Sequence, residues 1–264
     1  MFRWLFCLSF FVSVAFAETI DQLTSADQVT EEWLIRQGNL SGYSDHISHF
    51  KEIFSQTKVR TFLEFGLGLS TKYFLDNSRK VISVEFITHG YGPEYYKKCV
   101  QFFNQAYNWI PIAFFSGYKG DTDWAPYKYL GSEAVYKAAA YQCGTHKNYA
   151  LIDDFYLIEL DAFVKNLQKY HQIDIAFVDP GIYLRGDLVQ ILFGKVPIIV
   201  AHDTYCRALG DKDDVYGYSR IVTPDHYEEI FLPYGVGTTV WVSLNGHYQE
   251  LINNLKKYAQ GFQP

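Results

Sequence analysis

The stretch Val59–Phe86 constrains the fold of this chain more than any other. It contains an apolar strand that ends at Glu64, a turn with Gly66 and Gly68, a short helix, and a second apolar strand that ends at Glu85. Alternation of strand and helix predicts parallel pairing, with the helices packed on the sheet. Ligands of such sheets bind at the carboxyl ends of the strands, which is where this turn is placed.

The same alternation continues to the end of the chain. Further buried strands are predicted at 109–115, 173–179 and 196–201, and a terminal antiparallel hairpin at 229–244. This order predicts an α/β fold. We expect a Rossmann-like, doubly wound, mostly parallel sheet of seven strands with an antiparallel C-terminal strand and helices on both faces. Because no internal repeat or low-complexity linker interrupts the pattern, residues 18–264 are expected to form one domain.

The first 17 residues have the pattern of a secretory signal peptide. Arg3 precedes an apolar run at 4–16, and Ala15 and Ala17 form an A-x-A arrangement. Cleavage near Ala17 would export the protein to a periplasm or to the outside of the cell. The run is shorter than the roughly 20 residues of a membrane-spanning helix, and no later stretch is apolar enough, so no stable membrane span is expected after cleavage. An uncleaved membrane anchor is the alternative.

Two segments flank the predicted sheet. Residues 20–56 have a helical pattern, with a first helix expected to end at Gly38, and are predicted to cover one sheet edge or the ligand cleft. His46 and His49 have a spacing that metal ligands can use, but a solvated helix face is the preferred interpretation. The Tyr- and Gly-rich residues 116–148 are predicted to form a substrate-side insertion, because long loops in compact domains are usually functional.

Charge restricts the class of partner. The formal net charge is -6, and no basic stripe is present in the sequence. Proteins that bind nucleic acid gain most of their affinity by neutralising phosphates with Lys and Arg. Nucleic acid is therefore not an expected partner. The oligomeric state is not readable from these features.

The glycine-rich turn has the features of a nucleotide-binding loop. Gly66 and Gly68 allow a close approach of the backbone to a ligand, and Glu85 is placed where a carboxylate can accept both hydroxyls of a ribose. The dinucleotide fingerprint G-x-G-x-x-G would need glycine where Thr71 stands. This difference disfavours a nicotinamide-dependent oxidoreductase. A merely structural turn is the other alternative.

An acid two residues before the first glycine gives E-x-G-x-G, which resembles motif I of the class I S-adenosylmethionine-dependent methyltransferases. SVEF resembles motif II of that family. FVDP, with Arg185 six residues after its aspartate, and IIVAHD resemble the fourth and fifth strands of its small-molecule O-methyltransferases. The resemblance implies a site for S-adenosylmethionine made by Glu64, Gly66, Gly68, Ser70 and Glu85.

Three side chains at the ends of two later strands are candidates for catalysis: Asp179, His202 and Asp203. In the catechol-type branch of the family, acids at similar positions bind a divalent cation, so Asp179 and Asp203 are the candidate ligands of magnesium or a similar ion. His202 replaces part of that branch's Asp-Asn pair and is alternatively a general base. The structural alternative is that the two aspartates cap turns and His202 fills a pocket.

Two functions remain in competition. The motifs favour an exported S-adenosylmethionine-dependent methyltransferase that transfers a methyl group to a hydroxyl of a small molecule or a sugar. The predicted signal peptide favours a catalytically inactive, exported binding or effector protein that keeps the methyltransferase fold, because S-adenosylmethionine is a cytosolic metabolite. The fold alone does not decide between them, since function depends on the site.

Overall fold

The computed structural model describes most of the chain. The described residues are 20, 22–41, 44–88, 92–143, 154–210 and 214–261. The predicted signal peptide 1–17, with its cleavage site near Ala17, and the last part of the predicted insertion 116–148 lie outside them.

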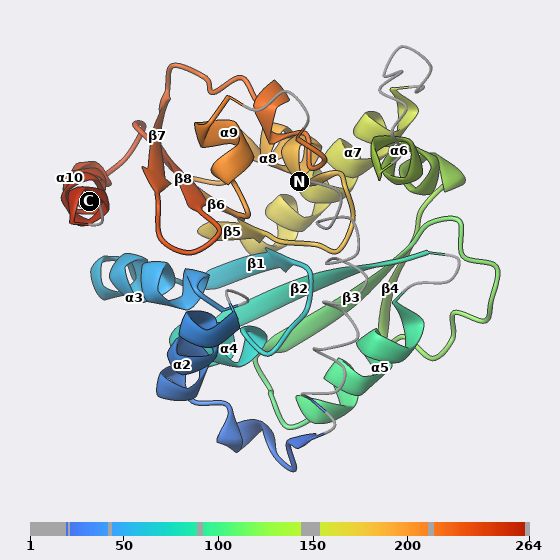
Figure 1. Cartoon of the computed structure of the whole chain (residues 1–264). Coiled ribbons are helices and arrows are strands. Elements are labelled where there is room, and N and C mark those ends of the chain that lie inside the picture. The colour runs from blue at the N-terminus through green and yellow to red at the C-terminus, as the bar shows by residue number, and fades with distance from the viewer. Residues whose placement is uncertain are drawn as a thin grey trace, which may run out of the picture.

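All strands of the described residues form one eight-stranded sheet in the order β4-β3-β2-β1-β5-β6-β8-β7 (Figure 1). Neighbouring strands from β4 to β6 pair in parallel, and β8 pairs antiparallel to both β6 and β7. The predicted α/β fold, with a mostly parallel sheet and an antiparallel strand near its C-terminus, is confirmed. The strands are β1 (Thr61–Phe65), β2 (Lys80–Ile87), β3 (Trp109–Phe115), β4 (Tyr127–Leu130), β5 (Ile175–Val178), β6 (Ile198–His202), β7 (Tyr227–Leu232) and β8 (Thr238–Ser243).

The predicted number of seven strands was wrong, because the sheet has an eighth strand, β4, at its edge. This strand belongs to the predicted insertion 116–148 and has only four residues, YKYL. Three of its side chains are exposed, so it lacks the apolar run by which the other strands are recognised. It pairs with β3 through backbone hydrogen bonds, from Ile112–Tyr127 to Phe115–Leu130.

Helices cover both faces of the sheet (Figure 1). One apolar core joins the sheet to α3, α4, α5 and α10, and a second core joins the opposite face to α6, α7 and α8. Neighbouring residues of a strand point to opposite faces, so Phe62 of β1 lies in the first core and Leu63 in the second. The helices are α2 (Glu31–Ser41), α3 (His46–Gln56), α4 (Thr71–Asn77), α5 (Pro93–Phe102), α6 (Glu133–Cys143), α7 (Phe155–His171), α8 (Arg185–Leu192), α9 (Tyr205–Ala208) and α10 (Gln249–Gln260), with 3₁₀ turns η2 (Ala26–Gln28) and η4 (Tyr218–Arg220).

The N-terminal helices differ from the prediction at Gly38. Helix α2 does not end at this glycine but continues to Ser41. A Cβ atom on Gly38 would lie 2.7 Å from the backbone nitrogen of Asp45, at the start of α3. Gly38 therefore allows α2 to pack closely on the chain that leads into α3, at the cost in helix propensity that glycine carries.

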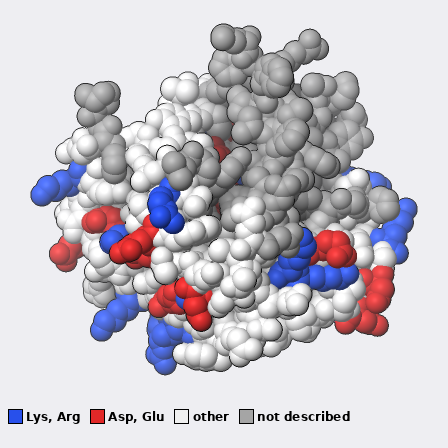
Figure 2. Space-filling view, turned by 60° about the horizontal axis from the view of Figure 1, so that its bottom comes forward, with Lys and Arg blue, Asp and Glu red and all other residues white. Residues whose placement is uncertain are grey.

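The described surface shows charges of both signs. Lys and Arg side chains are interspersed with Asp and Glu side chains on the face drawn in Figure 2. Across the described part of the chain, no helix has the length and apolar character needed to cross a bilayer.

Phe50 anchors α3 to the sheet and gives a test of this packing. Its ring centroid lies 5.5 Å from Phe62, 4.8 Å from Phe74 and 5.0 Å from Phe177, and its side chain is fully buried. We expect Phe50→Ala to lower the free energy of unfolding by about 3–5 kcal/mol, measured by urea denaturation, because the substitution leaves a cavity between helix and sheet. The control is Phe155→Ala, because Phe155 is half exposed. Equal losses in the free energy of unfolding for the two variants would contradict the packing described.

Candidate functional site

The two glycines of the turn after β1 have different surroundings. Gly66 has a φ of +97°, and a Cβ on it would lie 2.5 Å from the carbonyl oxygen of Asp179, so the fold itself requires glycine there. Among the described residues, a Cβ on Gly68 would meet only the Tyr95 hydroxyl, at 3.7 Å. These residues therefore leave the backbone at Gly68 open on the side where a side chain would project, which is what the close approach of a ligand needs.

Glu64, near the end of β1, is buried directly beneath the turn. Its Oε1 accepts hydrogen bonds from Thr71 Oγ1, at 2.8 Å, and from Ser83 Oγ. Thr71 Oγ1 also accepts from the Gly68 N–H at 3.2 Å, so Glu64 supports the turn through Thr71. Burial raises the pKa of Glu64 to about 8; the charges of Glu85 and Asp179 add to the rise, and the two hydroxyl hydrogen bonds oppose it.

Glu85, on the neighbouring strand β2, is buried next to the same turn. Its Oε2 accepts a hydrogen bond of 2.9 Å from the Leu67 N–H, between the two glycines. Burial raises the pKa of Glu85 to about 7, although the Leu67 hydrogen bond lowers it, and the charge of Asp179 adds to the rise. Two carboxyl groups with pKa values this high are largely protonated in slightly acidic solution, and both would gain from a cationic neighbour.

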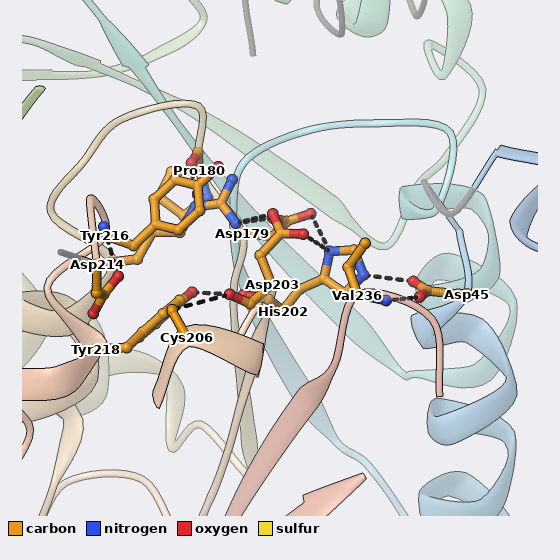
Figure 3. A network of polar contacts seen from close by, with 11 residues as sticks. Asp45, Asp179, Pro180, His202, Asp203, Cys206, Asp214, Tyr216, Tyr218 and Val236 are labelled. Carbon is orange, nitrogen blue, oxygen red and sulfur yellow. Dashed lines mark hydrogen bonds and ion pairs between the residues drawn. The ribbon is translucent and has the colours of Figure 1, made fainter. Parts of the chain in front are cut away.

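The predicted catalytic residues lie together at the ends of β5 and β6 (Figure 3). The two aspartates among them pair with a buried arginine. Arg185, the first residue of α8, places Nη1 2.6 Å from Asp179 Oδ1 and 2.8 Å from Asp203 Oδ2. Its Nε donates to the Pro180 carbonyl at 2.9 Å, and its guanidinium carbon lies 4.1 Å from the centroid of the Tyr216 ring. One cation thus holds two carboxylates from neighbouring strands.

His202, the last residue of β6, continues this network toward α3. Its Nε2 lies 2.5 Å from Asp45 Oδ1, and its Nδ1 lies 3.5 Å from Asp179 Oδ2 and 3.9 Å from Asp203 Oδ1. The second oxygen of Asp45, Oδ2, accepts from the Val236 N–H at 2.9 Å, in the turn between β7 and β8. Asp45 therefore joins the helical cover to the sheet and to its terminal hairpin (Figure 3).

The network keeps its members charged. Burial would lower the pKa of His202, but the charges of Asp203 and Asp179 and the hydrogen bonds to Asp179 and Asp45 raise it well above its ordinary value. Burial likewise opposes ionisation of Asp179, but the charges of Arg185 and His202 lower its pKa to about 2. His202 is consequently an imidazolium at neutral pH with carboxylates at both ring nitrogens, and this state does not fit the general-base role expected from the sequence.

His46 and His49 do not lie on a solvated face, and that interpretation was wrong. Both are buried, because α3 packs this face against the sheet and the C-terminal elements. His46 Nε2 lies 2.9 Å from Ser70 Oγ, and its ring centroid lies 4.7 Å from that of His202. Burial lowers the pKa of His46 to about 3, so this ring is neutral beside the charged one.

The residues of the turn fit the cofactor that the motifs imply. S-adenosylmethionine carries positive charge on its sulfonium and amino groups, and the turn brings two buried carboxyl groups and an open backbone at Gly68 together. A divalent cation fits less well at the other predicted site. The carboxylates of Asp179 and Asp203 already share the guanidinium nitrogen of Arg185, and a second cation at the same position would be repelled.

Comparisons with known proteins give similarity of structure only. No family model and no curated protein matches the chain. A crystal structure assigned as a caffeoyl-CoA O-methyltransferase from Staphylococcus aureus is similar at 12% identity and a TM-score of 0.49, over 81% of this chain and 92% of that one. The Podospora anserina methyltransferase PaMTH1, with SAH bound, is similar at 12% identity and a TM-score of 0.43, over 84% and 88%. At these values neither likeness identifies a reaction for this chain.

The Asp45–His202 pair gives a test of the network. We expect Asp45→Asn to lower the free energy of unfolding by about 3 kcal/mol at pH 7, because it removes one partner of a buried ion pair and leaves His202 near an uncharged amide. Asp76→Asn, which removes the surface partner of Lys72, is the control and is expected to cost less than about 1 kcal/mol. Similar losses for the two variants, measured by chemical denaturation, would show that the buried pair has no special role.

Proposed function

We propose that the chain is an S-adenosylmethionine-dependent methyltransferase that is exported and acts on a hydroxyl of a small molecule or a sugar. The observation that carries the proposal is the turn at Gly66–Gly68 with Glu64 and Glu85 buried next to it, Glu85 bonded to it directly and Glu64 through Thr71. A turn with two adjacent buried acids suits a nucleoside ligand with positive charge and ribose hydroxyls.

When bound, S-adenosylmethionine supplies an already activated methyl donor, so the protein's task is chiefly alignment. Glu85 would accept the ribose hydroxyls and Glu64 would stabilise the turn that faces the methionine part, with Gly66, Gly68 and Ser70 lining it. Asp179 and Asp203 are partly exposed, with 24% and 29% of their side-chain surfaces accessible, and would orient an acceptor hydroxyl by accepting its hydrogen bond. His202 and Arg185 would keep both acids in place.

The second candidate function is a binding or effector protein without catalysis. It is favoured by the extent to which the chain's own groups already occupy the candidate site: Glu85 is bonded to Leu67, and Ser70 to His46. The signal-peptide pattern of residues 1–17 also favours it, because a protein outside the cytosol would meet little S-adenosylmethionine.

Calorimetric titration with S-adenosylmethionine separates the two functions. The methyltransferase proposal predicts saturable binding that weakens at least about tenfold in Glu85→Gln, because hydrogen bonds to a charged acceptor are lost. Glu94→Gln is the matched control, since Glu94 is 82% exposed on α5 and pairs only with Lys97 among the ion pairs of the described residues. No binding at millimolar ligand would refute the methyltransferase and leave the binding protein as the surviving proposal.

The affinity for S-adenosylmethionine is also expected to depend on pH. Glu85 has a pKa of about 7 without ligand, and a cationic ligand binds better to its ionised form. Affinity should therefore rise about tenfold between pH 6 and pH 8, as the ionised fraction of one such group rises from about a tenth to about nine tenths. The affinity should depend less on pH in Glu85→Gln, and its dependence on pH should be unchanged in Glu94→Gln. An affinity that fell with rising pH would contradict the role given to Glu85.

A further inference from the structure

We infer that Arg185 takes the place of a divalent cation between Asp179 and Asp203, so that the strand ends at β5 and β6 need no metal. The guanidinium nitrogen Nη1 bridges Oδ1 of Asp179 and Oδ2 of Asp203 at 2.6 and 2.8 Å. An ion that bridged these two oxygens would need the same position, a little over 2 Å from each of them.

The remaining carboxylate oxygens of this cluster also face the chain's own groups. Asp179 Oδ2 and Asp203 Oδ1 both face His202 Nδ1, at 3.5 and 3.9 Å, and Asp45 divides its two oxygens between His202 and the Val236 N–H. A metal ion bound by Asp179 Oδ1 and Asp203 Oδ2 would have to displace Arg185. Asp179, His202 and Asp203 also each have a ligand atom within 4.8 Å of the others, but an ion held there would lie beside the same guanidinium, which would repel a second cation. A metal ion at Asp45 would have to break the pair with His202.

Arg185 is held in this position from three directions. Its side chain is only 8% exposed, its Nε donates to the Pro180 carbonyl, and the Tyr216 ring lies over the guanidinium. A guanidinium stays charged throughout the physiological pH range, and its stacking and fixed fork of donors cannot be reproduced by lysine. The charge that orders the two acids is therefore a covalent part of the chain and not an exchangeable ion. Arg185 is in this sense a positioning residue, and the inference holds whether or not the protein transfers methyl groups.

The inference that Arg185 takes the place of a metal ion is tested by measuring the binding of divalent ions. The native protein should show no calorimetric binding of Mg²⁺, Mn²⁺ or Ca²⁺ at millimolar concentration, and neither these ions nor EDTA should move its melting temperature. In Arg185→Ala the two carboxylates lose their cation, and Mn²⁺ or Ca²⁺ should then raise the melting temperature by several degrees. This gain should disappear in the double variant Arg185→Ala, Asp203→Asn.

Arg60→Ala is the control for loss of an arginine, because Arg60 is exposed and pairs with Asp174 away from this cluster; it should gain no response to metal. One divalent ion bound to the native protein and lost in Asp203→Asn would overturn the inference. A folded Arg185→Ala protein that gains no response to metal would overturn it as well. If Arg185→Ala does not fold, Arg185→Gln, which keeps some hydrogen bonding without the charge, replaces it, and the native-protein titration decides independently. None of these experiments uses S-adenosylmethionine. Their failure can therefore be distinguished from failure of the proposed methyltransferase function.

Discussion

The buried network of Asp45, His202, Asp179, Asp203 and Arg185 is the interaction on which the carboxyl edge of the sheet depends. It contains three carboxylates and two cations, and these opposite charges stabilise one another in surroundings that are largely buried. Its members come from the residue before α3, from β6 and α8, and from the loops after β5 and β6. The position of the N-terminal cover, the orientation of the strand ends and the stacking of Tyr216 therefore depend on one set of ion pairs.

The glycine turn beside this network depends on a different balance. Glu64 and Glu85 gain hydrogen bonds from Thr71, Ser83 and the Leu67 N–H but no cation from the ion pairs of the described residues, and their pKa values rise accordingly. Asp179 follows β5, the strand next to β1, and the charges of Arg185 and His202 lower its pKa although it is buried. The site thus contains two kinds of acid. Asp179 and Asp203 are already paired with cations, whereas Glu64 and Glu85 would be stabilised by a cation that the described residues do not provide.

Local patterns were enough to predict most of the fold. Apolar runs ending in acids predicted β1, β2, β5 and β6, and the buried-strand pattern of residues 173–179 corresponds to β5. The short strand β4 was missed because its partner supplies backbone hydrogen bonds without requiring apolar side chains. Gly38 was misinterpreted because a glycine inside a helix looks like a helix end until the neighbouring chain that it accommodates is known.

The candidate site was predictable only in part. Strand ends are local features, so Glu64, Glu85, Asp179, His202 and Asp203 could be selected from their positions in the sequence. Asp45, the third acid that faces His202, could not. Asp45 has the pattern of a helix cap, but it makes no capping hydrogen bond and instead pairs with a residue 157 positions later. A single sequence does not show that two residues so far apart in the chain are in contact. For the same reason, it did not show that His46 is buried.

That separation also has a consequence for the order of folding. Asp45 contacts His202 and Val236, which follow it by 157 and 191 residues. A chain made from its N-terminus exposes this aspartate to water long before either partner exists, and contacts of such large sequence separation form slowly because a long loop must be closed. The N-terminal cover is thus an early part of the chain whose contacts with His202 and Val236 can form only after β6 and the turn between β7 and β8 have been made. A nascent or truncated chain that ends before β8 would contain the glycine turn and both of its acids without the contacts that close the cover over them.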